Sequence, residues 1–188
     1  DVRKLFKTMR ESTLLGLILL IDAIFLCFGI DALSISYRES VTYFNGSGVL
    51  HYLTNVSCAL FGQNDWALRL PFMFIHFGSV ILLYKLSKPL LKRKVDRLTS
   101  VLIYMMLPGV SAGAILVNEA SLVIFLTLLF VWFFQEGWRN QAYIVLIIAL
   151  FIDNAFAILY LSLFFYGIVQ KDSKLFSLVL ILFGLFRV

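Results

Sequence analysis

Residues 14–30 read LLGLILLIDAIFLCFGI, an apolar run that contains one charged residue, Asp22. A run of this kind is long enough for a membrane-spanning helix, and it lacks the alternation of apolar and polar residues that marks a transmembrane β-strand. A carboxylate near the middle of a span is costly unless it faces protein or water, so we expect Asp22 to point into a helix bundle. There it would be either a functional relay or an interhelical hydrogen-bonding group.

The composition extends this interpretation to the whole chain. Of the 188 residues, 61% are hydrophobic and 14% are charged, and the mean hydropathy is +0.94. So few polar residues cannot enclose a water-soluble core, whereas a bundle that faces lipid needs no polar surface. We therefore predict an all-α protein, a polytopic bundle of transmembrane helices.

Basic residues set the expected orientation. Arg3, Lys4, Lys7 and Arg10 precede the first apolar run, and a second basic cluster lies within residues 85–97. By the positive-inside rule both clusters are cytoplasmic, and the net charge of +5 is explained by anionic lipid rather than by nucleic acid. The first run has no evident cleavage site after it, so we interpret it as a retained span. The predicted location is the bacterial cytoplasmic (inner) membrane.

The remaining apolar runs predict further spans. One break is expected at Pro108-Gly109, and another at Asp153-Asn154, where we favour two short spans over one long tilted span. The chain begins without methionine and ends in an apolar run, so we expect the N-terminal part of a longer protein. The predicted spans are approximately residues 13–30, 70–86, 98–113, 119–134, 142–152, 155–169 and 175–188.

Polar residues are concentrated in residues 31–71, between the first two predicted spans. The apolar residues there recur at helical spacing on both sides of the sequence NGSG at residues 45–48, which predicts two amphipathic helices on the outer membrane surface. Such helices would present Glu39 and His51 to lipid headgroups. In the second span, His76 is interpreted as an interhelical hydrogen-bonding residue.

The chain contains no phosphate-binding loop, zinc-protease motif or nucleophile elbow. Its most specific motif is LFGQNDWALRLP at residues 60–71. Together with the basic loop, the Pro-Gly break and Glu119 at the start of the fourth predicted span, this motif resembles the GT-C glycosyltransferases that use polyprenyl-phosphate sugars, of the aminoarabinose transferase and protein O-mannosyltransferase type. The resemblance covers nearly the whole chain.

This resemblance implies a membrane enzyme that transfers a sugar from a polyprenyl-phosphate donor to a lipid, glycan or protein acceptor at the outer face. The family's first outer loop carries an acid, often in an Asp-Glu-x-x-Tyr setting, as the base that deprotonates the acceptor. Here residues 37–43, YRESVTY, match that position. The match makes Glu39 the candidate base and Arg38 a departure from the family pattern. Asp31 is the rival base, or alternatively a helix N-cap.

The other candidate residues would bind substrate. Positive charge must stabilise the departing phosphate, which Arg69 could provide if it is not an interfacial anchor. Glu119 could act with the base by orienting the acceptor or by binding a divalent metal ion, or it could cap its helix. His51, Arg38 and Tyr43 complete the predicted substrate-binding set.

Two other classes of protein remain open from the sequence. A transporter or flippase-like protein would use Asp22, Glu119 and Asp153 as an intramembrane charge pathway. A membrane subunit without catalytic activity would use none of the candidate residues chemically.

Overall fold

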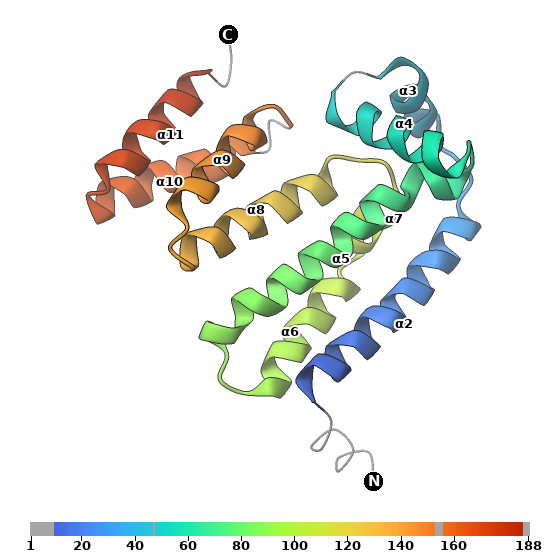
Figure 1. Ribbon diagram of the computed structural model, residues 1–188, viewed down its shortest axis with the longest axis horizontal. Helices are drawn as coiled ribbons and strands as arrows, with labels where there is room; N and C mark the ends of the chain where they lie inside the picture. Colours follow the sequence, from blue (N-terminus) through green and yellow to red (C-terminus); the bar gives the residue numbers. More distant parts are fainter. Residues whose placement is uncertain (1–9, 47, 153–155, 186–188) are drawn as a thin grey trace. The chain divides into compact units, whose positions relative to one another are not determined.

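The computed structural model describes residues 10–46, 48–152 and 156–185. The chain divides into two compact units, residues 1–121 and residues 122–188. Every regular element among the described residues is a helix (Figure 1). The predicted all-α membrane bundle is therefore confirmed in its fold class.

In the first unit, helices α2 (Glu11–Ala32) and α5 (Asp65–Leu90) pack together with α6 (Lys94–Met106) and α7 (Pro108–Ile115) (Figure 1). α2 and α5 are long and apolar enough to cross a membrane. α6 and α7 meet that criterion as a single bent span, with an angle of 65° between them. The bend falls at Leu107 and Pro108, because proline favours the first turn of a new helix and disrupts the preceding one.

A buried polar pair lies between two helices of this bundle. Nε2 of His76 on α5 lies 2.9 Å from Oδ2 of Asp22 on α2, and both side chains are at least nine-tenths buried. The ring of Tyr104 on α6 stacks on His76. The predictions that Asp22 faces inward and that His76 bonds between helices are confirmed, and they are fulfilled by the same contact.

Helices α3 (Tyr37–Asn45) and α4 (Val49–Phe61) form the polar interval between α2 and α5. α3 starts with a capping box, in which the Ser36 hydroxyl accepts from Glu39 N and the Glu39 carboxylate accepts from Ser36 N. The interpretation of Asp31 as an N-cap is wrong, because α2 continues through Ala32 and Ser36 caps the next helix. The two predicted helices are present on either side of the expected break.

An ion pair lies at the other end of the first unit, away from α3 and α4. Arg97, at the start of α6, donates from Nε and Nη2 to the two carboxylate oxygens of Glu11, at 2.7 and 2.9 Å. Its Nη1 donates to the Leu91 carbonyl oxygen. Arg97 thus ties the first turn of α2 to the loop between α5 and α6, which lies within the predicted basic cluster of residues 85–97.

The second unit comprises most of α8 (Ala120–Gln135), with α9 (Arg139–Leu150), α10 (Phe156–Gln170) and α11 (Ser173–Leu185). Arg139 at the start of α9 donates to Asp172, just after α10, at 2.7 Å, so α9 and α10 run in opposite directions. The structure thus has two helices here rather than one continuous helix. That each crosses the membrane stays a prediction, and Asp153 and Asn154 lie outside the described residues.

Candidate functional site

A buried ion pair organises the end of the first unit that carries α3 and α4. The guanidinium of Arg69, on the first turns of α5, is fully buried, and all five of its N–H groups donate hydrogen bonds. Two of these bonds reach the Glu39 carboxylate at 3.0 Å each, as a bidentate pair. The other three reach the carbonyl oxygens of Ile30, Leu33 and Ser34. Arg69 therefore fixes the end of α2 and the start of α3 against α5.

The Glu39 carboxylate is equally occupied. Besides Arg69, it accepts from Ser36 N at 2.8 Å and from Val117 N at 3.2 Å, which makes four hydrogen bonds in all. Burial alone would raise the pKa of Glu39, but the bonds from Arg69, Ser36 and Val117 outweigh it and lower this pKa below its ordinary value. Glu39 is thus held ionised and joins α3, α5 and the segment before α8.

This geometry corrects the expected positions of both residues. Glu39 was predicted to face the lipid headgroups, but it is buried, with 2% of its surface exposed. Arg69 was predicted to reach a phosphate, but it is fully buried, with 0% of its surface exposed. The reason is that Glu39 and Arg69 neutralise each other's charge. In addition, Arg69 donates to backbone carbonyl groups and Glu39 accepts from backbone N–H groups, so both side chains are hydrogen-bonded inside the protein. Their assignment to catalysis and substrate binding stays a prediction.

A second ion pair lies at the surface of the same end. Nη2 of Arg38 is 3.7 Å from Oε2 of Glu119, and the two side chains are 79% and 34% exposed. Arg38 follows the first residue of α3, and Glu119 follows Val117 by two residues, so the Glu39–Val117 bond brings their segments together. Beside Glu119, at the start of α8, Asn118 Oδ1 accepts from Ala120 N at 2.9 Å, and the capping of α8 by Glu119 stays a prediction.

Asp31 supplies another accessible carboxylate. It lies in the last turn of α2, is exposed, and its Oδ1 accepts from the indole Nε1 of Trp66 at 2.7 Å. Trp66 is in the first turn of α5, three residues before Arg69. The sequence motif that includes Trp66 and Arg69 therefore makes two separate contacts with the segment that follows the first span.

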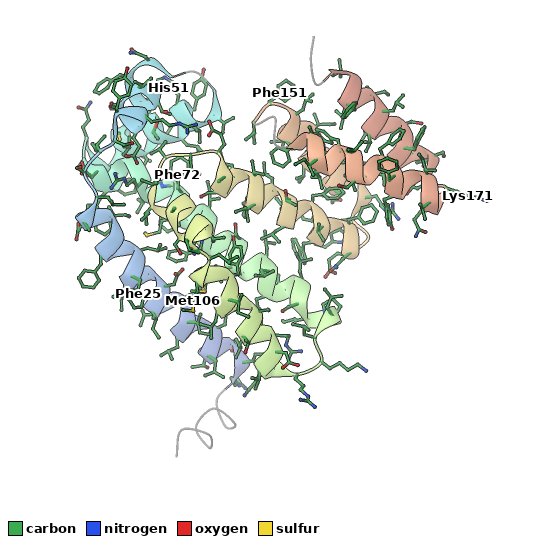
Figure 2. All side chains as sticks on the ribbon, turned by 180° about the vertical axis from the view of Figure 1, so that it is seen from behind. Phe25, His51, Phe72, Met106, Phe151 and Lys171 are labelled. Atoms are coloured by element: carbon green, nitrogen blue, oxygen red, sulfur yellow. The ribbon has the colours of Figure 1, made fainter. Side chains whose placement is uncertain are left out.

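His51 and Tyr43 have contacts within the α3–α4 pair. His51 lies in α4 (Figure 2). Its Nδ1 is 3.1 Å from the Thr42 carbonyl oxygen, and its ring also contacts the Asn55 amide. Tyr43 packs against a cluster that includes Cys58 and Phe72, and it lines a pocket of about 150 Å³. Asn64 and Asp65 line the same pocket. Substrate binding by His51 and Tyr43 stays a prediction.

Sequence reasoning missed Ser36, Trp66 and Val117. The pattern Ser36-x-x-Glu39 is a capping-box signature and could have identified Glu39 as a helix-capping residue. The Val117 contact is made by a backbone N–H, so no side-chain pattern could indicate it. Within residues 10–46, 48–152 and 156–185, no three His, Cys, Asp or Glu side chains lie close enough to hold a metal ion together.

The fold and this cluster define an integral helical membrane protein with paired charges gathered at one end of its first unit. The model of the dolichyl-phosphate-mannose-protein mannosyltransferase family matches residues 47–186, and the chain belongs to this family. The match includes Arg69 and Glu119 and begins after Asp31, Arg38 and Glu39. The resemblance to polyprenyl-phosphate-dependent GT-C enzymes is thereby supported at the level of the family.

A protein similar to this chain is also named as a mannosyltransferase. The Bacillus subtilis (strain 168) protein named "Putative mannosyltransferase YkcB" is 30% identical over 104 residues, which are 55% of this chain. Those residues are 14% of the length of that protein, so the chain spans a small part of its relative. No solved structure matches the chain significantly.

Proposed function

We propose that this chain is part of a membrane glycosyltransferase that moves a sugar, mannose in the first instance, from a polyprenyl-phosphate donor to an acceptor at the outer face. Family membership supports the class of reaction. The observation that carries the proposal is the meeting of Arg38 and Glu119 at the end of the first unit remote from the Arg97–Glu11 pair. In the proposed orientation, the N-terminus and the basic loop are cytoplasmic.

Arg38 is the residue proposed to meet the donor phosphate. Its side chain is 79% exposed and has one distant acidic partner, whereas every N–H of Arg69 already has an acceptor. A guanidinium can bind two phosphate oxygens at once, which suits it to a leaving group that gains negative charge.

Glu119 is the residue proposed to receive the acceptor proton. Its carboxylate is 34% exposed, while the Glu39 carboxylate is fully hydrogen-bonded and has a lowered pKa that makes it a weak base. As the acceptor oxygen forms its bond to the anomeric carbon, its proton moves to Glu119. The bond from that carbon to the phosphate oxygen breaks, and polyprenyl phosphate leaves with the electron pair, beside Arg38. Asp31, in the last turn of α2, is the alternative base.

Glu39 and Arg69 have a positioning role in this proposal. Their ion pair fixes the first turn of α3, which carries Arg38, and the Glu39–Val117 bond fixes the segment that carries Glu119. An error of 1 Å in the placement of reacting groups can reduce rates by about 100-fold. The buried pair would therefore affect activity without contacting the substrate.

The test is sugar transfer by the full-length protein in liposomes, with a polyprenyl-phosphate mannose donor. Glu119→Gln should reduce kcat by about 100-fold to 10,000-fold, because it removes a proton acceptor while keeping the shape of the side chain. Glu136→Gln is the matched control, because Glu136 is exposed in the turn after α8. If Glu119→Gln and Asp31→Asn both transfer sugar at the wild-type rate, the proposed base is wrong.

A further inference from the structure

A pocket of about 430 Å³ lies between α4 and the first part of α5. Its walls are mainly large apolar side chains, among them Leu53 and Val56 on α4 and Leu70 and Phe74 on α5. Val56 and Phe74 are more than half exposed, so the pocket is open at the protein surface. Among the described residues, none that lines it is charged. Its size and lining suit one uncharged, largely apolar ligand.

One polar group in the wall of this pocket lacks a partner. Ser57 on α4 lines the pocket and is 5% exposed, and its Oγ is the one buried side-chain nitrogen or oxygen among the described residues that makes no hydrogen bond. Thr54 on α4 and Ser79 on α5 instead donate to the carbonyl oxygen four residues earlier in their own helix. Unpartnered buried groups are rare and costly, so Ser57 lacks an acceptor that the described chain does not supply.

The pocket lies at the part of α5 where the bilayer interface meets the hydrocarbon core. α5 has 26 residues and is about 39 Å long, which exceeds the roughly 30 Å of a bilayer's hydrocarbon. Its first turn carries Asp65 and Trp66, residue types that suit the interface, and Leu70 begins its apolar part about 8 Å further along. Tyr52, another interfacial residue type, lines the pocket and is 70% exposed. The pocket therefore opens at the depth of the ester groups of glycerolipids.

These features together define the chemistry of the ligand. The apolar walls accommodate a hydrocarbon chain, and the Ser57 hydroxyl can donate to a carbonyl oxygen that enters with this chain. An ester-linked acyl chain carries such an oxygen at its polar end, at the depth where the pocket opens. A polyisoprenoid tail has no carbonyl group and would leave Ser57 unpaired. A free fatty acid would bring a carboxylate, for which the lining offers no cation.

We propose that this pocket binds one acyl chain of a bilayer glycerophospholipid, whose ester carbonyl oxygen accepts a hydrogen bond from Ser57. The chain fills the space between α4 and α5 and so stabilises the position of α4 against the start of α5. This lipid is distinct from the sugar donor, because neither Arg38 nor Glu119 lines the pocket. The inference goes beyond the function proposed above and does not depend on it.

The experiment uses the full-length protein, freed of lipid in detergent, and two phospholipids that differ in one chemical feature. Diacyl phosphatidylglycerol carries ester carbonyl groups, whereas dialkyl phosphatidylglycerol has the same headgroup and chain length with ether linkages. Binding of each lipid is titrated by native mass spectrometry, and thermal unfolding is measured in parallel. We expect the wild type to bind the diacyl lipid about threefold to tenfold more tightly, the scale of one hydrogen bond, and to unfold at a higher temperature with it.

Two serine variants test the hydrogen bond. Ser57→Ala should bind the diacyl and dialkyl lipids equally, at the affinity of the wild type for the dialkyl lipid. Without lipid it should unfold at or above the wild-type temperature, because the change removes a buried group that has no partner. Ser162→Ala is the matched control and should keep the wild-type preference, since Ser162 is exposed on α10 and donates to the Ile158 carbonyl oxygen.

Two tryptophan variants locate the site on α4. Val56→Trp places an indole group in the pocket and should weaken the binding of both lipids about tenfold, the scale at which an apolar pocket discriminates shape. Ala59→Trp introduces the same side chain at an exposed residue of α4 that does not line the pocket. This control should bind both lipids as the wild type does.

Several outcomes would overturn the inference. Equal affinity of the wild type for the two lipids would show that no carbonyl oxygen is recognised, and an ester preference that persists in Ser57→Ala would place the ester at another site. Unchanged binding by Val56→Trp would place the lipid outside the pocket. A lipid-free dimer that Val56→Trp abolishes would identify a second copy of the chain as the occupant. None of these outcomes bears on the proposed base, which the Glu119→Gln variant tests separately.

Discussion

Replacing Glu39 with glutamine tests whether this carboxylate supports the fold or performs the chemistry. Glutamine keeps the size of the side chain but removes its charge and replaces one acceptor oxygen with a donor NH₂ group. That group would face N–H donors of Arg69, Ser36 or Val117, and the buried Arg69 charge would lose its counter-ion. Breaking a buried ion pair by removing one partner costs about 3–5 kcal/mol. We expect Glu39→Gln to destabilise the α3–α4 end of the first unit by this amount.

The measurement is thermal unfolding of the full-length protein in detergent, followed by tryptophan fluorescence, because Trp66 lies three residues from Arg69 in α5. Glu119→Gln is the control, since the Arg38–Glu119 pair is exposed and such pairs contribute about 0–1 kcal/mol. The pH dependence adds a second readout. The pKa of Glu39 is lowered in the folded protein, so its stabilisation is fully present above the unfolded value of about 4.3 and is lost as the pH falls below that value. The Glu39→Gln variant should lack this acid-dependent component.

One result would refute the positioning role. If Glu39→Gln unfolds at the wild-type temperature and keeps the wild-type acid profile, yet loses sugar transfer as fully as a base variant does, Glu39 acts as the base. Arg69→Lys separates the roles further. Lysine keeps the charge but has three donors in place of five, so at least two of the five hydrogen bonds that Arg69 donates would be lost.

Two further predictions concern helix packing. His76→Phe leaves the Asp22 carboxylate without its partner and should destabilise the protein by about 1–3 kcal/mol, measured by unfolding in detergent. Adding Asp22→Leu to this variant should restore part of the lost stability. A double variant less stable than His76→Phe alone would contradict the pairing. Gly167→Ala places a methyl group 3.3 Å from the Phe176 backbone and should cost about 1–3 kcal/mol, whereas Gly184→Ala meets open space and should stabilise α11 by up to about 1 kcal/mol. Equal effects of the two alanines, measured by the same unfolding assay, would refute this account of α10–α11 packing.

The sequence was sufficient for the fold class because the relevant signals are local. Apolar runs indicate helices, and Pro108 and the NGSG sequence indicate breaks, without knowledge of which helices pack together. Asp22 was predicted to face the bundle and His76 to bond to another helix, and the requirement to satisfy a polar group in hydrocarbon made both predictions correct. Their pairing with each other depends on how α2 and α5 are aligned, which no local pattern specifies.

The candidate site was less predictable for a related reason. Residue type and sequence position identified Glu39, Arg69, Arg38 and Glu119 as candidates. Two acidic and two arginine side chains can form ion pairs in more than one combination, and the sequence does not specify which. The backbone decided the outcome. Arg69 is drawn into the interior by three carbonyl groups at the turn after α2, and Glu39 follows because it both caps α3 and neutralises Arg69. Carbonyl and N–H positions of this kind arise only from the folded chain.

The different strengths of the two ion pairs support the assignment of Arg38, rather than Arg69, to the donor phosphate. A phosphate that reached Arg69 would have to replace Glu39 and expose a buried charge, at a cost of about 3–5 kcal/mol before any gain from binding. A phosphate that reaches Arg38 competes with an exposed contact of 3.7 Å, which contributes about 1 kcal/mol at most. The same exchange would release Glu119 from its cationic neighbour and leave its carboxylate free to accept a proton. Donor binding and the freeing of the base are therefore one event in the proposed mechanism, so a donor that lacks the phosphate should leave Glu119 paired and the acceptor unreacted.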